Sequence, residues 1–464
     1  MSKKIFWLSL AIFFLLRIFS FIFTPETPLL GASIVNTLLS IIVACATSYL
    51  LIKNNNWGWY IIAGEIILGG SGSYLGVGSV TLRTLLLIFS LTIFLAQKIK
   101  EKKTKDITND KFFFIILGIG IWAIISAIIG FKNGHNLNAV ISDLIPYLFL
   151  GYYFPLKEII TNNPKFLNVT KNILIATLVG NFIIITGTFF GFSSGLFSLQ
   201  DSYYHWYRDV AGGKITALPF YFFRLVLNEH LLIVPIILWI IFELIKQKNT
   251  KLNWIVGIIT ILVLVINLTR IYYVALFVGT LLLFKKDYWL SCLKYSIVFA
   301  FILIIGFTTI HFTASRGQSL GWEIFGLRLQ SIASPSIEDS SLSRMLLLPK
   351  IKEKIINSPI AGLGLGDTVT VYSPVFKQTI TTPHFDWGYL EIWAEMGLIG
   401  LILWLTLIIK IIKKAKPQTL LLAMLGALLI INLTSPAFFH VFGIILLIYF
   451  LAKLSCDKSI PTTN

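Results

Sequence analysis

Charge is scarce in this sequence. Asp, Glu, Lys and Arg make up 13% of its 464 residues, against about a quarter in an ordinary soluble domain. Hydrophobic residues make up 56%, and the mean hydropathy is +0.84. This balance excludes a soluble or disordered chain and indicates an integral membrane protein. No small-residue cleavage site follows "FIFTPETP", so the first apolar run is predicted to be a span and not a removed signal peptide.

Cysteine is also rare. The three cysteines, Cys45, Cys292 and Cys456, are odd in number, lie far apart and match no metal-ligand spacing. The sequence therefore supports neither a disulfide framework nor a zinc site, and we expect no bound metal and no cofactor.

Acidic residues are fewer than basic ones, 21 against 38, which gives a net charge of +17. The lysines cluster in short connectors between apolar runs: 97–111, 246–251, 285–286 and 410–416. Short basic loops mark the cytoplasmic side of a membrane protein. The positions of the lysines therefore indicate which loops are cytoplasmic, and we expect no nucleic-acid partner.

The apolar runs predict an all-α polytopic membrane protein. We expect spans at about 5–23, 33–52, 57–70, 79–97, 112–131, 138–154, 171–190, 230–246, 252–267, 271–284, 291–310, 387–409, 418–432 and 436–453. With both termini in the cytoplasm, every lysine-rich connector falls on the cytoplasmic side. Some runs are shorter than the roughly 20 residues of a full crossing, so the prediction is about 12–14 transmembrane helices.

This pattern divides the chain into six parts. They are N-terminal spans (1–190), a first extracytoplasmic segment (191–229), central spans (230–310), a large extracytoplasmic loop (311–386), C-terminal spans (387–453) and a cytoplasmic tail (454–464). No inverted repeat is visible, although transporters built from related halves commonly have one.

The central spans include a predicted hairpin at 252–284, with Arg270 near its outer tip. A run of about 14 residues rises only about 21 Å in a hydrocarbon core of about 30 Å. Arg270 would therefore lie below the outer surface, where an arginine is costly and commonly serves a partner or an anion. Helix capping or a structural ion pair is the alternative interpretation.

Several motifs of soluble enzymes are absent: the sequence has no Walker A loop, nucleotide-binding GxGxxG or HExxH. The glycine-rich "AGLGLGD" (361–367) is predicted to form a turn after Pro359, with substrate contact as the alternative. The outer segments instead supply arginines, a residue type that binds phosphate and diphosphate bidentately. These are Arg208, Arg224, Arg316, Arg328 and Arg344. An anionic lipid headgroup is therefore the expected ligand.

A candidate base stands at the end of the large loop, in "TTPHFDWGYLEIWAEMGLIG" (381–400). Pro383 suits a helix start, so we expect a helix from about 384–386 with His384, Glu391 and Glu395 on one face. Histidine is the commonest general base, but an interfacial histidine with buried packing partners fits this spacing equally well. A second histidine, His205 in "YYHWYRD", has an aromatic setting compatible with sugar contact.

Four of these stretches resemble motifs of the bacterial O-antigen ligase and O-antigen polymerase superfamily. In "PHFDWGYLEIWAEMGLIGLILWL", residues His384, Glu395, Gly397 and Gly400 match the family pattern, with Phe385 where Asn is usual. The other stretches are "SRMLLLPKIKEKIINSPIAGLGLG" (343–366), "NLTRIYYVALFVGTLLLF" (267–284) and, more loosely, "FRLVLNEHLLIV" (223–234), which keeps Asn228. The resemblance covers about residues 220–410 in order.

The resemblance implies a GT-C-like glycosyltransferase acting outside the bacterial cytoplasmic membrane. Its donor would be a polyprenyl-diphosphate-linked oligosaccharide, its acceptor a glycan or glycolipid, and its partners the lipid bilayer, a flippase and chain-length regulators. By this resemblance His384 is the base, and Arg270 and Arg344 hold the diphosphate. Arg224, Asn228, Asp386, Glu395, His205 and Arg208 are candidate substrate or supporting residues. Because Phe385 replaces Asn, Asp386 is the candidate to orient His384.

The motifs leave two activities of the family open. A polymerase joins lipid-linked repeat units, whereas a ligase transfers the finished glycan to an acceptor such as lipid A core. We favour a metal-independent, inverting surface-polysaccharide polymerase and keep the ligase as the alternative. A transporter of lipid-linked oligosaccharide is the competing class, and the long outer loop argues against it.

Overall fold

The computed structural model describes residues 3–23, 33–78, 80–248, 250–334, 339–373 and 377–456. The chain forms two compact units that alternate along the sequence. Unit 1 comprises 1–102, 158–269 and 284–322, and unit 2 comprises 103–157, 270–283 and 323–464. The boundary between Thr269 and Arg270 splits the predicted hairpin, so its two helices pack in different units.

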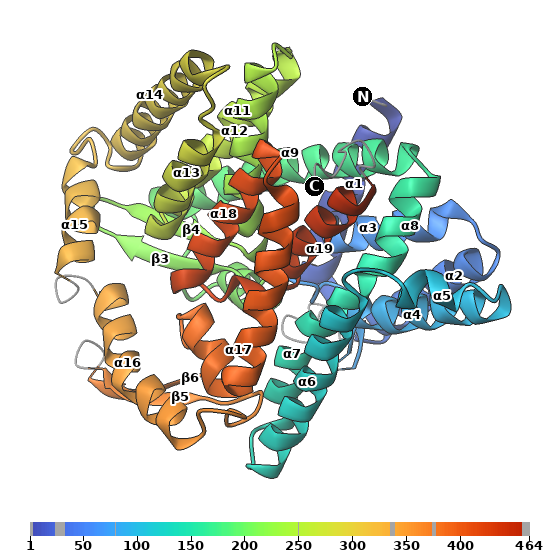
Figure 1. The fold of residues 1–464 in the computed structure, drawn as a ribbon. Helices are drawn as coiled ribbons and strands as arrows, with labels where there is room; N and C mark the ends of the chain where they lie inside the picture. The colour runs from blue at the N-terminus through green and yellow to red at the C-terminus, as the bar shows by residue number, and fades with distance from the viewer. Residues whose placement is uncertain are drawn as a thin grey trace. The chain divides into compact units, whose positions relative to one another are not determined.

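Unit 1 is a helical bundle with two short β-hairpins. Its main helices are α1 (Lys3–Phe23), α2 (Ser33–Ile52), α3 (Asn56–Leu68), α4 (Leu82–Lys100), α9 (Lys165–Ser194), α11 (Ile233–Ile245), α12 (Lys251–Asn267) and α14 (Trp289–Ala314). Helix α9 packs against α1, α3 and α12, and α12 also packs against α11 and α14. Figure 1 labels these elements. The bundle is therefore organised around α9 and α12.

Helix α1 shows how these sequences fold in lipid. Its large apolar side chains Leu8, Leu15 and Ile18 are exposed, whereas Arg17 and Ser20 are buried. In a bilayer the apolar surface needs no burial, and polar groups must find partners inside the protein. The bundle is therefore held by close packing and buried polar contacts.

Unit 2 contains the remaining long helices. They are α6 (Phe113–Lys132), α7 (Leu137–Leu148), α13 (Arg270–Leu283), α15 (Trp322–Ala333), α16 (Asp339–Asn357), α17 (Gly388–Ala415), α18 (Thr419–Thr434) and α19 (Val441–Cys456). Helix α17 packs against α6, α16 and α18, and α18 packs along α13. In Figure 1, α6 and α7 run beside each other.

The helices confirm an all-α polytopic membrane protein. Within the described ranges, nine helices are long and apolar enough to cross a membrane, and four shorter apolar helices accompany them. These four are α12, α13, α18 and α19. The predicted span 57–70 corresponds to α3, which has only 13 residues. Of the predicted tail, residues 457–464 lie outside the described residues.

The two long segments that we predict to be extracytoplasmic contain two of the three β-hairpins in the described residues. Segment 191–229 contains an antiparallel hairpin of β3 (Lys214–Leu218) and β4 (Phe222–Val226), with Thr216 opposite Arg224. Segment 311–386 contains α15, α16 and a hairpin of β5 (Val369–Ser373) and β6 (Gln378–Thr382). A third hairpin joins β1 (Gly76–Val77) to β2 (Val80–Thr81).

Candidate active site

His384 lies in a turn between β6 and α17, not on the helix. Helix α17 begins at Gly388, so the expected helix start at 384–386 is wrong. The Thr382 hydroxyl donates to the His384 carbonyl oxygen (2.8 Å) and accepts from the His384 amide (3.3 Å). Asp386 has a φ of +57°, a left-handed conformation that Asp tolerates better than most residues. These local contacts hold residues 382–386 in a turn where the first turn of the helix was expected.

Glu391 nevertheless reaches His384 from the first turns of α17. Its Oε1 lies 3.4 Å from His384 Nδ1, and its Oε2 accepts from the Phe385 amide at 3.2 Å. The Glu391 side chain is fully buried, whereas the His384 side chain is 40% exposed. When Nδ1 carries the proton toward Glu391, Nε2 is free to accept a proton from a substrate. The pair thus resembles the acid–histidine arrangement of general-base catalysis.

Phe385 anchors this turn through its side chain. The ring is fully buried against Leu347, Ile351, Val369 and Ala394, which come from α16, β5 and α17. An Asn at this position would orient the turn through polar contacts, whereas Phe385 does so by hydrophobic packing and by its backbone bond to Glu391. We expected Asp386 to orient His384, but the structure shows no direct contact between these two side chains.

Asp386 instead faces Arg344. Its Oδ2 lies 3.5 Å from Arg344 Nε, and both side chains are partly exposed. The alignment is too poor for a hydrogen bond at Nε. The Arg344 carbonyl oxygen accepts from Trp387 Nε1 at 3.1 Å, which fixes α16 against the turn. The structure therefore brings Arg344 to the turn that carries His384, as a diphosphate-binding residue for this site requires.

The surroundings of His384 favour its protonated form. Burial lowers the pKa of the imidazole, but the hydrogen bond to Glu391 and the negative charges of Glu391, Asp143 and Asp386 outweigh it and raise the pKa above its usual value of 6.5. A raised pKa makes His384 a stronger base once it is neutral.

Asp143 on α7 is a residue that the sequence analysis missed. It is 4% exposed, its carboxylate acts electrostatically on His384, and its Oδ2 accepts from the Gly366 amide at 3.0 Å. An aspartate within the apolar run 138–154 was the signal that could have identified it, because buried acids in spans are commonly functional.

The glycine-rich loop 361–367 supports α17 and does not form an open phosphate cradle. The Leu363 and Gly364 amides donate to the carbonyl oxygens of Ala394 and Glu395 (2.8 and 2.9 Å). These carbonyls are available because α17 is interrupted at Gly397 (φ +67°), where a Cβ would overlap the Ile360 carbonyl. The predicted turn after Pro359 thus has a packing role.

Glu395 also holds the glycine-rich loop 361–367 against α17. It is fully buried, and its Oε1 accepts from the Asp367 amide at 3.1 Å. Asp367 in turn pairs with Lys354 on α16 at 2.8 Å and lies 3.7 Å from His135 Nε2. Lys354 and His135 are further residues that sequence reasoning did not select for this site.

Arg270 begins α13 and is half-buried. Its guanidinium binds the Ser331 hydroxyl of α15, and Ser331 donates to the Arg328 carbonyl oxygen at 2.9 Å. These contacts hold the start of α13, which carries Arg270, against α15, which carries Arg328, within unit 2.

The other candidates lie in unit 1. Arg224 is buried and donates to the Asn267 carbonyl oxygen and to Thr269 Oγ1, both at 3.0 Å, so it stabilises the end of α12. Asn228 opens the 3₁₀ turn Asn228–Leu232. Both residues thus belong to unit 1, where Arg224 holds the end of α12 and Asn228 begins a turn.

His205 and Arg208 form an exposed cluster in unit 1. Arg208 makes two hydrogen bonds to Asp209, at 2.6 and 2.8 Å, and lies 3.5 Å from His205 Nδ1. The hydrogen bonds from Arg208 lower the pKa of Asp209 below its usual value. The Arg208 guanidinium is thus already engaged by a carboxylate.

The described part of the chain holds no group of three or more His, Cys, Asp or Glu side chains arranged to bind a metal ion. The cluster around His384 combines this imidazole and that of His440, whose ring centroid lies 6.2 Å away, with buried carboxyls that accept hydrogen bonds from backbone amides.

Residues 255–405 match the family described as O-antigen ligase. This range includes Arg270, Arg344, His384 and Glu395, while Arg224 and Asn228 lie before it. No curated protein and no solved structure matches the chain. The matched family comprises polysaccharide ligases and polymerases, which are enzymes of the glycosyltransferase type.

Proposed function

On the premise that residues 255–405 form an O-antigen ligase domain of a multi-pass membrane protein, we propose that this enzyme polymerises a surface polysaccharide. It transfers oligosaccharide repeat units from a polyprenyl-diphosphate donor to a sugar hydroxyl on the extracytoplasmic face of the bacterial cytoplasmic membrane. The observation that carries the proposal is the half-exposed His384, held by buried Glu391 next to Arg344.

In the proposed step, the acceptor hydroxyl oxygen attacks the anomeric carbon while the bond from that carbon to the diphosphate oxygen breaks. His384 Nε2 takes the hydroxyl proton, and Glu391 stabilises the resulting imidazolium through Nδ1. The diphosphate leaves with an additional negative charge, which a preorganised guanidinium can stabilise. A single displacement inverts the anomeric centre and needs no covalent enzyme intermediate.

Arg344 and Arg270 are assigned to the diphosphate. Arg344 is supported by its backbone bond to Trp387, three residues after His384. Arg270 is supported by its half-buried position at the start of α13 and by its bond to Ser331. A guanidinium fits the geometry of two phosphate oxygens better than an ammonium does.

The test is reconstitution of the purified full-length protein with a polyprenyl-diphosphate-linked repeat unit. We expect a ladder of polymer and release of free polyprenyl diphosphate without added metal or nucleotide, and loss of both in His384→Ala. A strict need for metal or nucleotide would refute this mechanism. Movement of the intact donor across the bilayer without bond cleavage would indicate a transporter.

Adding a second acceptor separates the two activities of the family. A ladder formed from repeat units alone supports the polymerase. Transfer that occurs only when a lipid A core acceptor is supplied would replace the polymerase by the ligase, with the same base and the same leaving group.

A further inference from the structure

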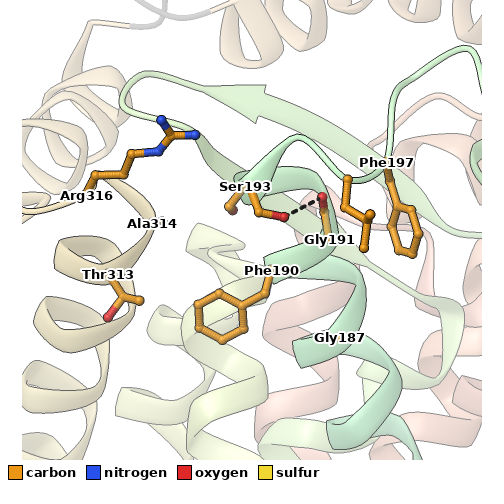
Figure 2. A pocket seen from close by; sticks show the side chains of 10 residues that line it. Gly187, Phe190, Gly191, Ser193, Phe197, Thr313, Ala314 and Arg316 are labelled. Atoms are coloured by element: carbon orange, nitrogen blue, oxygen red, sulfur yellow. Dashed lines mark hydrogen bonds between the residues drawn. The ribbon is translucent and has the colours of Figure 1, made fainter.

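Unit 1 contains a pocket that the proposed transfer reaction does not use. It has a volume of about 500 Å³ and lies at the C-terminal ends of α9 and α14. Figure 2 shows Thr313 and Arg316 on one side and Phe190 and Gly191 on the other. His384, Arg344 and Arg270 do not line it. The walls are mainly apolar, as expected for a hydrocarbon ligand.

The floor of the pocket is open because of a glycine. Gly187 and Gly191 are spaced as in a small-xxx-small pattern, which normally lets two helices approach closely. A Cβ at Gly191 would overlap the Phe197 ring, but a Cβ at Gly187 would meet no atom within 4 Å. The Phe197 ring, which lies in the turn after α9, therefore explains Gly191, and Gly187 is left as the origin of the free space.

A buried hydroxyl lines the same pocket. Ser193 is 4% exposed, and its Oγ has no hydrogen-bond partner within the described ranges. Its neighbour Ser194 differs, because its hydroxyl donates to the Gly191 carbonyl oxygen at 3.2 Å. A buried polar group without a partner is costly, and a ligand oxygen at this position would remove that cost.

Arg316 supplies a cation at the rim. It follows α14 with a φ of +54°, is exposed, and stacks over the Tyr221 ring at 5.2 Å. Among the described ion pairs, none involves Arg316. A guanidinium over an apolar groove complements a molecule with a hydrocarbon chain and a phosphate head.

The position of the pocket fits a lipid of the outer leaflet. Lys165 and Lys171 lie near the N-terminus of α9, and Lys285 and Lys286 precede α14. By the positive-inside rule these ends are cytoplasmic, so the pocket lies at the opposite ends of the two helices.

We infer that this groove binds the isoprenoid chain of a polyprenyl diphosphate, with the diphosphate at Arg316 and Ser193. A volume of about 500 Å³ is within the roughly 300–1,000 Å³ range of ligand pockets and holds the part of an isoprenoid chain that adjoins the diphosphate. The inference rests on the proposed function for the identity of the lipid. It adds a holding site for the carrier outside the residues assigned to transfer.

The test is photocrosslinking from inside the groove. The full-length protein, with Phe190 replaced by p-benzoyl-phenylalanine, is placed in phosphatidylcholine nanodiscs that contain polyprenyl diphosphate. After irradiation, mass spectrometry identifies the lipid attached at position 190. We expect a polyprenyl diphosphate adduct, and an equal mole fraction of phosphatidylglycerol should neither replace it nor form a comparable adduct.

Two variants fill or neutralise the site. Gly187→Leu places a side chain in open space and should reduce the adduct at least tenfold, and Arg316→Gln should reduce it about tenfold. Gly64→Leu is the matched control, because a Cβ at this glycine of α3 also meets no atom within 4 Å and Gly64 does not line the pocket. The control should crosslink as the unaltered protein does.

Two outcomes overturn the inference. An adduct undiminished in both Gly187→Leu and Arg316→Gln would place the chain outside the groove, and efficient replacement by phosphatidylglycerol would make the site a general lipid contact. Crosslinking requires no turnover, so its failure leaves the transfer assay unaffected. Conversely, groove-dependent crosslinking in a protein that fails to transfer sugars would refute only the proposed function.

Discussion

The two units treat buried charge differently. In unit 1, Arg17 pairs with Glu229 at 3.0 Å, and Arg83 pairs with Glu65 at 3.1 Å. Arg17 also donates to the Leu68 carbonyl oxygen and lies over the Phe13 ring. Arg17 and Arg83 thus each have a carboxylate and further polar contacts, as expected when charge serves folding in a membrane.

Unit 2 has buried carboxyls beside two histidines, His384 and His440, whose ring centroids lie 6.2 Å apart. Asp143, Glu391 and Glu395 are 0–4% exposed, and none of them forms an ion pair with a lysine or arginine in the described residues. Their partners are backbone amides and His384. A matched pair of this kind supports the fold, whereas carboxyls without a lysine or arginine partner beside an accessible histidine are the arrangement on which we base the proposed proton transfer.

Removing the base should have the largest effect on activity. His384→Ala should reduce transfer by at least about 100-fold, within the range of a lost general base, because the variant lacks the imidazole that we propose takes the acceptor proton. The reconstituted assay measures this at matched protein level. His205→Ala is the control, since His205 is an exposed histidine of unit 1. An active His384→Ala variant would refute the assignment of the base.

Neutralising one buried carboxylate in each unit separates folding from function. Glu229→Gln leaves Arg17 without its charge partner and should lower the free energy of unfolding by about 3–5 kcal/mol, seen as a lower melting temperature in detergent. Glu391→Gln removes a carboxylate that has no permanent cation, so we expect a near-normal melting temperature and an activity reduced about tenfold or more. A normal melting temperature in Glu229→Gln together with a strongly lowered one in Glu391→Gln would contradict the difference between the two units.

Replacing arginine by lysine tests the diphosphate residues. Arg270→Lys and Arg344→Lys retain the charge but lose the bidentate guanidinium, and we expect transfer to fall about tenfold. Arg208→Lys should have little effect, because Arg208 is exposed and already bound to Asp209. Transfer rates are measured for the three variants at saturating acceptor and varied donor concentration. If lysine changed the rate equally little at all three positions, Arg270 and Arg344 would not be the diphosphate-binding residues.

The smallest expected effect is a shift in pH dependence. Only neutral His384 accepts a proton, so activity should fall as pH decreases through its pKa, which lies above 6.5. Glu391→Gln removes the carboxylate that contributes most to raising this pKa, while the smaller effects of Asp143 and Asp386 and the opposing effect of burial remain. The acidic limb of the kcat/KM profile should therefore move to lower pH. An unchanged limb would show that His384 does not control it.

Much of the fold was predictable because apolar runs report directly on lipid burial. The all-α class, the positions of the apolar helices and the break after Asn267 follow from hydropathy and from the residues at 268–270, whereas α15 and α16 lie in the segment predicted to be a loop. The start of α17 was not predictable, because Pro383 is compatible with a helix. The Thr382 contacts and the left-handed Asp386 decide against one.

The sequence by itself determined that this chain is a multi-pass membrane protein and that His384, Arg270 and Arg344 belong to motifs of one family, since these depend on composition and order along the chain. Only the tertiary structure decided that Glu391 reaches His384, that Asp143 from α7 acts on the same histidine, and that the glycine-rich loop supports the break at Gly397. These contacts join segments up to 250 positions apart, and no local pattern specifies them because they depend on how the helices of unit 2 pack.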